Sequence, residues 1–254
     1  MRTLLSDIIG IYFVFKLLKL ILYRHNPTVL YCMHKILIIN PKGGCGKSTV
    51  STQLAGYYAN WGMSVALADM DPQKSSLNWL RKRPANTANI IAINAVQGRI
   101  QIPIKTDCVI IDTAAGLQDK DLRYLAKLCD TIIIPVLPSE MDIHAVSHFV
   151  YQLLIKYRIT FEDRNICIIA NRAKMRSLVY QDLINYLSTL KLPLISTLRE
   201  SKYYLDCAAS GLSIFDPVKP DLSNLISDWQ PIFQWLHEVE MKKKFRSKSS
   251  AVAV

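Results

Sequence analysis

The sequence lacks paired cysteines, because none of its six cysteines belongs to a C-x-x-C pair and most lie within apolar runs. Isolated thiols in apolar runs behave as small hydrophobic residues, which indicates a reducing compartment and no zinc site. His144 and His148 are four residues apart, but the glutamate of an H-E-x-x-H zinc motif is absent. The chain also has no internal repeat and no low-complexity linker. Its 254 residues therefore predict one domain of ordinary size with tails.

Acidic residues are the scarcer charged class, with 20 Asp and Glu against 31 Lys and Arg and a net charge of +11. The excess is concentrated at the two ends, in residues 1–33 and above all after Met241, where five basic residues occur within seven positions (Lys242, Lys243, Lys244, Arg246 and Lys248). A basic tail on a nearly neutral body is typical of contact with an anionic polymer or surface. A solvated tail that only aids solubility is the alternative hypothesis.

Long hydrophobic runs are few, and the most apolar one, residues 7–23, is interrupted by Lys16 and Lys19. It falls short of the roughly 20 residues that span a bilayer and is followed by no small-residue cleavage site. We favour a natural start at Met33 over a peripheral membrane anchor or a packed helix. The predicted boundaries are a hydrophobic basic extension over 1–33, the main domain over 34–240, and a basic flexible tail over 241–254.

From Lys35 onward, continuous apolar runs alternate with stretches of helical periodicity. The predicted strands are Lys35–Asn40, Ser64–Asp69, Ile90–Asn94, Cys108–Asp112, Thr131–Pro135 and Asn165–Asn171. The predicted helices are Ser48–Trp61, Ser75–Arg83, Lys120–Cys129, Met141–Tyr157, Leu178–Leu190 and Asp221–Val239. Continuous apolar strands between helices predict an α/β fold: a single doubly wound, mostly parallel sheet with helices on both faces.

The clearest motif lies between the first strand and the first helix, at residues 40–49, Asn-Pro-Lys-Gly-Gly-Cys-Gly-Lys-Ser-Thr. A glycine-rich turn in this position lets backbone N–H groups converge on a phosphate at the N-terminus of the following helix. Lys47 would reach the β- and γ-phosphates, and the Ser48 hydroxyl would hold Mg²⁺. The motif predicts a P-loop NTPase domain with ATP and Mg²⁺ as cofactors. The predicted nucleotide-binding residues of the loop are Gly43, Gly44, Cys45, Gly46, Lys47, Ser48 and Thr49.

Lys42, a second lysine at the start of this loop, sets the motif apart from the ordinary pattern. Here the sequence resembles the deviant Walker A ATPases of the ParA/MinD family, whose signature is Lys-Gly-Gly-x-Gly-Lys-Ser/Thr. The resemblance extends from about His34 to about Phe215 and is closest to the short ParA partition ATPases. It implies an ATP-sandwich homodimer in which Lys42 contacts the nucleotide held by the opposing subunit.

Carboxylates at the ends of two predicted strands agree with this resemblance. Asp69-Met70-Asp71-Pro72-Gln73 ends the second strand, and Val109–Asp112 has the form of a Walker B strand. The resemblance implies that Asp71 aligns the attacking water, that Asp69 supports the Mg²⁺ site and that Asp112 holds Mg²⁺. Lys42, Lys47 and Asp71 are thus the expected catalytic residues. Ala114 and Ala115 replace the prolines usual after this aspartate, which leaves the stiffness of that loop open.

Two later regions resemble the family as well. Asn171 ends a strand where the matching asparagine bonds the adenine, although an asparagine there can also be a turn residue. Leu198–Phe215 matches a region that carries basic DNA-binding residues in some members, which makes Arg199 and Lys202 candidates for DNA contact. A solvated helix face is the alternative reading of these two cations.

The resemblance implies an ATPase that dimerises on ATP, binds DNA without sequence preference and positions plasmid or chromosomal cargo. It would work in the cytoplasm on the nucleoid with a small ParB-like or cargo adaptor protein. A MinD-like ATPase at the membrane is the main alternative, provided that the N-terminal segment belongs to the natural protein. A bacterial tyrosine kinase is disfavoured because no tyrosine follows Tyr204. The expected cluster cysteines of an iron-protein reductase are absent, and Asp-x-Asp-Pro-Gln speaks against an amide-forming ligase.

Overall fold

The computed structural model describes residues 33–159, 165–189, 193–217 and 222–251, with side chains as far as 243 in the last range. The described residues belong to one compact unit, Met33–Val254. Predictions for residues 1–32, including the membrane anchor and the packed helix, lie outside the described residues. No helix among the described residues combines the length and the apolar character needed to cross a membrane.

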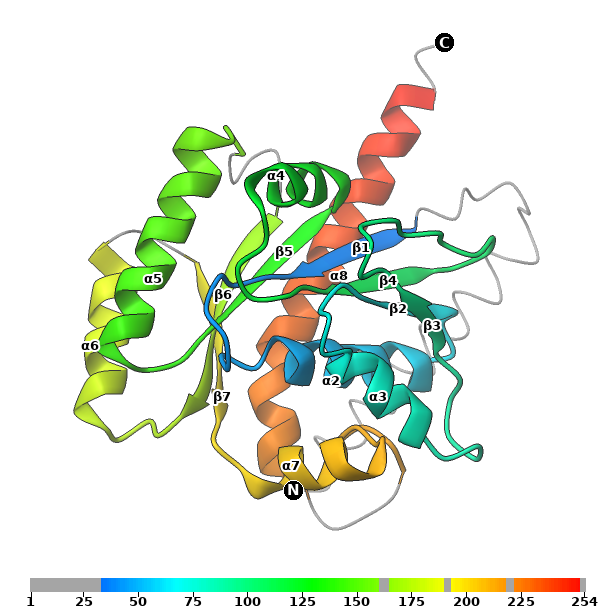
Figure 1. The fold of residues 1–254 in the computed structure, drawn as a ribbon, viewed down its shortest axis with the longest axis horizontal. Helices are drawn as coiled ribbons and strands as arrows, with labels where there is room; N and C mark the ends of the chain where they lie inside the picture. The colour runs from blue at the N-terminus through cyan, green and yellow to red at the C-terminus, as the bar shows by residue number, and fades with distance from the viewer. Residues whose placement is uncertain (1–32, 160–164, 190–192, 218–221, 252–254) are drawn as a thin grey trace. The chain divides into compact units, whose positions relative to one another are not determined.

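A seven-stranded sheet, parallel throughout, forms the centre of the unit (Figure 1). Its spatial order is β3-β2-β4-β1-β5-β6-β7. The strands are β1 (His34–Ile38), β2 (Val65–Asp69), β3 (Ile91–Asn94), β4 (Cys108–Asp112), β5 (Thr131–Val136), β6 (Asn165–Ala173) and β7 (Leu194–Arg199). The predicted α/β fold with one parallel sheet is therefore confirmed.

Alternation along β1 and the residue after it, Ile39, shows why the sheet is covered on both faces. Ile36 and Ile38 join one buried cluster, whereas Leu37 and Ile39 join the other. Successive strand side chains point to opposite faces, so an uninterrupted apolar run requires apolar partners on both sides. All four side chains are at most 2% exposed.

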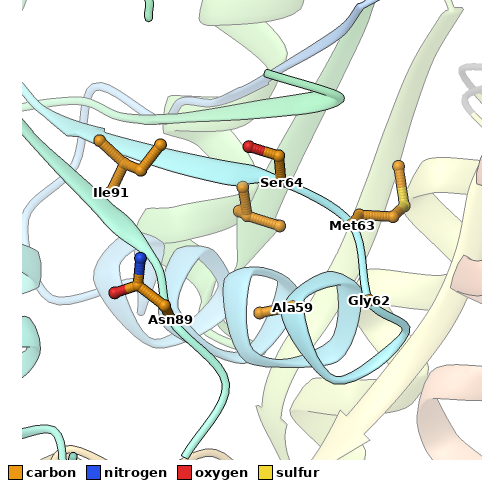
Figure 2. A pocket seen from close by; sticks show the side chains of 7 residues that line it. Ala59, Gly62, Met63, Ser64, Asn89 and Ile91 are labelled. Carbon is orange, nitrogen blue, oxygen red and sulfur yellow. The ribbon is translucent and has the colours of Figure 1, made fainter. Parts of the chain in front are cut away.

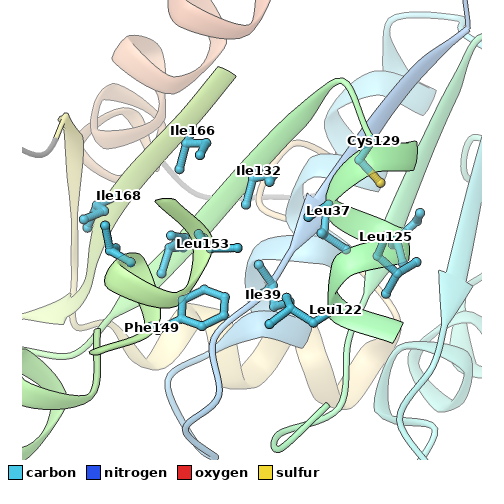
Figure 3. Packing of buried hydrophobic residues seen from close by; sticks show 14 of the residues in the cluster. Leu37, Ile39, Leu122, Leu125, Cys129, Ile132, Phe149, Leu153, Ile166 and Ile168 are labelled. Carbon is cyan, nitrogen blue, oxygen red and sulfur yellow. The ribbon is translucent and has the colours of Figure 1, made fainter. Parts of the chain in front are cut away.

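The helices supply those partners in two layers. One layer contains α2 (Lys47–Asn60), α3 (Ser75–Lys82), α7 (Lys202–Ser210) and α8 (Ser223–Ala251). The other contains α4 (Asp119–Leu128), α5 (Glu140–Tyr151), the π-helix η1 (Gln152–Lys156) and α6 (Leu178–Thr189). Figure 3 shows the second layer, where Leu122 and Leu125 of α4 and Phe149 of α5 meet Leu37 of β1 and Ile39, the residue after this strand.

Several elements differ from the expectation. β7 and α7 were not predicted, because β7 is a half-buried edge strand without a continuous apolar run and α7 buries only Tyr204. The expected helix Met141–Tyr157 changes to π-helical geometry at Gln152. The last helix was expected to end at Val239 but continues to Ala251. The stretch from residue 241, for which a flexible tail was expected, is thus helical as far as Ala251.

Lys243 accounts for part of this extension, because it attaches α8 to the start of the sheet. Its Nζ lies 2.7 Å from Asp130 Oδ2 and donates to the Met33 carbonyl at 2.8 Å. The same Asp130 oxygen accepts the Lys35 N–H at 2.9 Å, so one carboxylate joins α8 and β1. At least one basic residue of the tail therefore has a structural partner, which composition alone does not reveal.

Replacing Lys243 by alanine should lower stability by about 1 kcal/mol, because this removes a partly exposed ion pair and one hydrogen bond. For a chain of this size the expected fall in Tm is about 2–4 °C. Lys242→Ala, which removes the same charge at an exposed neighbouring position, is the matched control. Thermal unfolding of both variants decides the point, and equal Tm values would contradict a structural role for Lys243.

Candidate functional site

The candidate site lies at the carboxyl ends of the central strands, where ligands bind in open parallel sheets. The loop after β1 leads into α2, and β2 and β4 end at Asp69 and Asp112. These two aspartates are register partners on adjacent strands. Three motifs that are well separated in the sequence therefore meet at one edge of the sheet. They are the glycine loop (residues 40–49), the DMDPQ segment (Asp69–Gln73) and the Walker B strand (Val109–Asp112).

The backbone of the glycine loop explains why glycine is needed at Gly46. Its φ is +92°, and an added Cβ would come within 2.0 Å of Asn171 Nδ2. A side chain there would meet both backbone strain and a steric clash. Gly46 is also the N-cap of α2, and no described side chain caps this helix start. The N-terminal amides of α2 thus begin directly behind the loop, as phosphate binding requires.

The two lysines of the loop have different environments. Lys47 is only 6% exposed, and its Nζ donates to the Lys42 carbonyl at 2.9 Å. Lys42 is 32% exposed, and its Nζ lies 2.6 Å from Oδ2 of Asp142 at the start of α5. Asp142 is 2% exposed and also accepts a hydrogen bond from the Ser139 hydroxyl. The ammonium of Lys42 is therefore held within its own subunit by a buried carboxylate.

Asp112 is the residue best suited to hold a divalent cation. It is fully buried, and its Oδ1 has no hydrogen-bond partner among the described residues. Burial raises the pKa of Asp112 to about 6, although the neighbouring Ser76 and Ser48 hydroxyls oppose this shift. A bound cation would favour the charged carboxylate. A carboxyl group that has one unpartnered oxygen and the Ser48 hydroxyl as a neighbour fits Mg²⁺, which prefers oxygen ligands.

Asp69 and Asp71 shape the turn that follows β2. Asp69 is fully buried, and its two oxygens accept the N–H groups of Asp71 at 2.9 Å and Leu77 at 3.1 Å. Burial raises the pKa of Asp69 against the opposing effect of these bonds. Asp71 is only partly buried, and its Oδ1 accepts the Gln73 N–H at 2.9 Å. Asp69 thus stabilises the turn, and its support of a metal site stays a prediction, as does the role of Asp71 in aligning water.

Asn171 makes a contact that differs in kind from the expected one. Its side-chain Nδ2 donates to the Cys45 carbonyl at 2.8 Å, and the residue is 4% exposed. It therefore supports the glycine loop from the end of β6, while an adenine contact remains a prediction. The loop after β4 is attached as well, since the Thr113 hydroxyl donates to the Ile38 carbonyl and Gly116 N–H to the Pro41 carbonyl.

The two candidate DNA-binding cations are not equivalent. Arg199 donates from both Nε and one terminal nitrogen to Asp228, each at 2.7 Å, and Asp228 is 8% exposed. This ion pair raises the pKa of Arg199 and attaches β7 to α8. Lys202 is exposed at the first position of α7. Of the two, Lys202 offers the more accessible charge.

Two residues of the site were not identified from the sequence, namely Asp142 and Ser76. The Ser139-x-x-Asp142 spacing could have indicated a helix start, because Ser139 accepts the Asp142 N–H as an N-cap. Nothing in the local pattern indicated that Asp142 would pair with Lys42, which is 100 residues away. Ser76 lies in an ordinary helical stretch, and its contact with Asp112 arises only from the packing of α3 against the sheet.

An open hollow of about 370 Å³ lies at the opposite edge of the sheet (Figure 2). It is lined by the end of α2 and the starts of β2 and β3, at Ala59, Gly62, Met63, Ser64, Val65, Asn89 and Ile91. No lining residue is charged. This hollow is therefore separate from the glycine loop and its carboxylates.

The fold and this site together define an α/β protein with a P-loop nucleotide-binding site. The chain belongs to the CobQ/CobB/MinD/ParA nucleotide binding domain family, whose model matches residues 36–214. The family resemblance predicted from the loop is thereby confirmed.

Known proteins of this kind include maintenance of carboxysome distribution protein A of Halothiobacillus neapolitanus. It is 27% identical over 187 residues, which cover 71% of this chain and 86% of that protein. A putative plasmid partition protein of Borrelia burgdorferi B31 bound to AMPPNP superposes with a TM-score of 0.64 and 20% identity over 83% of this chain and 99% of that one. The MinD cell division protein of Aquifex aeolicus superposes with a TM-score of 0.55 and 20% identity. The match covers 71% of this chain and 88% of that one. At these identities the two structures show the fold alone.

Proposed function

We propose that this protein is a ParA-like, Mg²⁺-dependent ATPase that dimerises on ATP and positions plasmid or chromosomal cargo on non-specifically bound DNA. The observation that carries the proposal is the placement of Lys42 at the start of a glycine loop whose Lys47 and Ser48 lie near the buried Asp112. A partner of the small ParB-like or cargo-adaptor type would stimulate hydrolysis. The carboxysome distribution protein among its relatives supports a positioning role.

Within this proposal, Lys42 serves dimerisation and not primary nucleotide binding. Its ammonium pairs with Asp142 in the same subunit, so contact with a nucleotide across a dimer requires that this ion pair open. Opening leaves a carboxylate that is 2% exposed without its cation, which is costly. ATP-bound dimerisation would have to offset that cost through new contacts with the phosphates.

Lys42→Ala should leave ATP binding by the monomer measurable and abolish ATP-dependent dimerisation. Stability should also fall, by about 2 kcal/mol, because Asp142 loses its partner; the partial exposure of Lys42 keeps the loss below that of a fully buried pair. Analytical ultracentrifugation with ATP and thermal unfolding measure the two effects separately.

The double variant Lys42→Ala, Asp142→Asn is the control that separates them. It removes the unpaired buried charge and should recover most of the stability, yet it should remain monomeric with ATP. If either alanine variant dimerises with ATP as well as the parent, the proposed role of Lys42 is wrong.

DNA binding is tested by retention of unrelated duplexes with ATP, with ADP and without nucleotide, across a salt series. Two-fold symmetry would double the basic surface of the dimer, so retention is expected with ATP only. Affinity should fall with salt at a slope of about −0.9 per phosphate neutralised. Equal retention in all three states would refute the ATP switch, and no retention at low salt would refute DNA binding.

Lys202→Ala is the variant best suited to this assay. The substitution should weaken binding to all DNA sequences alike. It should also reduce the slope of affinity against salt by about one for each phosphate that is no longer neutralised. Lys120→Ala removes an exposed lysine from α4, in the other helical layer, and serves as its matched control. Arg199→Ala is less informative because it would also leave Asp228 unpaired. Truncation after Met241 is less informative for the same reason, because it removes Lys243 and leaves Asp130 without that ion pair.

A MinD-like ATPase at a membrane is the second candidate, motivated by the apolar residues 7–23 and the likeness to MinD. Sedimentation of the full chain with anionic lipid vesicles separates it from the DNA proposal. ATP-dependent sedimentation without DNA retention would favour this candidate.

A further inference from the structure

Ser76 is a buried polar residue to which the proposed reaction assigns no task. It is the second residue of α3 and is fully buried, and its hydroxyl donates to Oδ2 of Asp112. α3 begins four residues after Asp71, and Asp69 holds its first turn by accepting the Leu77 N–H. Ser76 therefore connects the helix that follows the DMDPQ segment to the end of β4.

The hydrogen bond makes the two oxygens of Asp112 unequal. Oδ2 has the Ser76 hydroxyl as its donor, whereas Oδ1 has no hydrogen-bond partner in the described part of the chain. The carboxylates of Asp69 and Asp112 end neighbouring strands in register, so Asp112 has a like charge as its neighbour and gains from a donor that fixes its orientation. The Ser76 hydroxyl, as the donor to Oδ2, selects one orientation of the carboxylate and leaves Oδ1 for another ligand.

We propose that Ser76 is a positioning residue for the cation site: its hydroxyl fixes Asp112 so that Oδ1 is presented to Mg²⁺ together with Ser48. The inference rests on the proposed nucleotide-dependent function. Side chains that orient metal ligands through a hydrogen bond typically change metal affinity by about 10–100-fold when they are removed. Because Ser76 lies on α3, the same bond also links the cation site to the segment that carries Asp71.

The test measures metal affinity directly, in the full chain with bound ADP. Binding of Mn²⁺ is followed by the decrease of the free-ion signal in electron paramagnetic resonance, which does not depend on turnover. Ser76→Ala should weaken Mn²⁺ binding about tenfold or more, while ADP affinity in the presence of EDTA stays that of the parent. Ser76→Thr retains a hydroxyl and should recover most of the affinity.

Ser75→Ala is the matched control, because Ser75 is the exposed neighbour at the first position of α3. It should leave Mn²⁺ affinity unchanged. Ser76→Cys keeps nearly the same volume with a weaker donor, and it should lie between the parent and Ser76→Ala even if the threonine variant packs poorly. Thermal unfolding verifies that each variant is folded.

Parent-like Mn²⁺ affinity in folded Ser76→Ala would overturn the inference. So would equal decreases in Ser75→Ala and Ser76→Ala, which would indicate a general effect on the start of the helix. A parent chain that binds no nucleotide would instead refute the proposed function, so the two failures can be told apart.

Discussion

Replacing Lys47 by alanine should lower ATP affinity by at least about 100-fold, because charge-assisted contacts of one ammonium with two phosphates contribute about 1.5–3 kcal/mol each. Lys47 is the first residue of α2 and is 6% exposed, so its charge is directed along the loop and not into solvent. Lys42 cannot replace it, since the Lys42 ammonium is paired with Asp142. Isothermal titration with a non-hydrolysable ATP analogue measures the change in affinity.

The fold should survive this change. The Nζ of Lys47 contacts the Lys42 carbonyl and the thiol of Cys45, both within the loop, so no distant element loses a partner. Lys82→Ala removes one exposed lysine from α3 and should leave ATP affinity unchanged. Parent-like ATP affinity in a folded Lys47→Ala variant would exclude the phosphate-binding role of this loop.

Asp71→Ala should reduce ATP turnover by at least about 100-fold, since orientation and activation of the attacking water contribute about 10²–10⁴-fold in comparable reactions. ATP affinity should stay close to that of the parent, because Lys47 and the glycine loop remain. The variant should therefore accumulate as an ATP-bound dimer. Single-turnover measurements with excess protein are required, because turnover without a stimulating partner should itself be slow.

Asp71→Asn distinguishes the proposed role of Asp71 in aligning water from its role in stabilising the turn after β2. An asparagine oxygen can still accept the Gln73 N–H, so this variant preserves the local backbone while it removes the negative charge. We expect Asp71→Asn to lose as much turnover as Asp71→Ala. Full turnover in the asparagine variant would mean that Asp71 is a turn residue and that another group aligns the water.

Much of the fold was predictable because continuous apolar strands admit few arrangements. Ile36–Ile39 is apolar at every position, so both faces of β1 must be buried and a parallel sheet between two helical layers follows. β7 escaped prediction because an edge strand needs an apolar pattern on only part of its surface. The extension of α8 was not predictable because its lysines lack amphipathic periodicity. The partners of Lys243 lie at the start of the sheet, far away in the sequence.

The sequence by itself determined the class of protein and the order of its motifs. This was possible because the residues expected to bind phosphate, including Lys42, Lys47 and Ser48, lie within one short segment. Only the tertiary structure decided which charges are free to act. Lys42 is paired with Asp142, Arg199 with Asp228, and Asp112 with Ser76, and each pair joins residues at least 29 positions apart. Such pairings depend on which strands end side by side and which helices cover them, and no local pattern of residues encodes that.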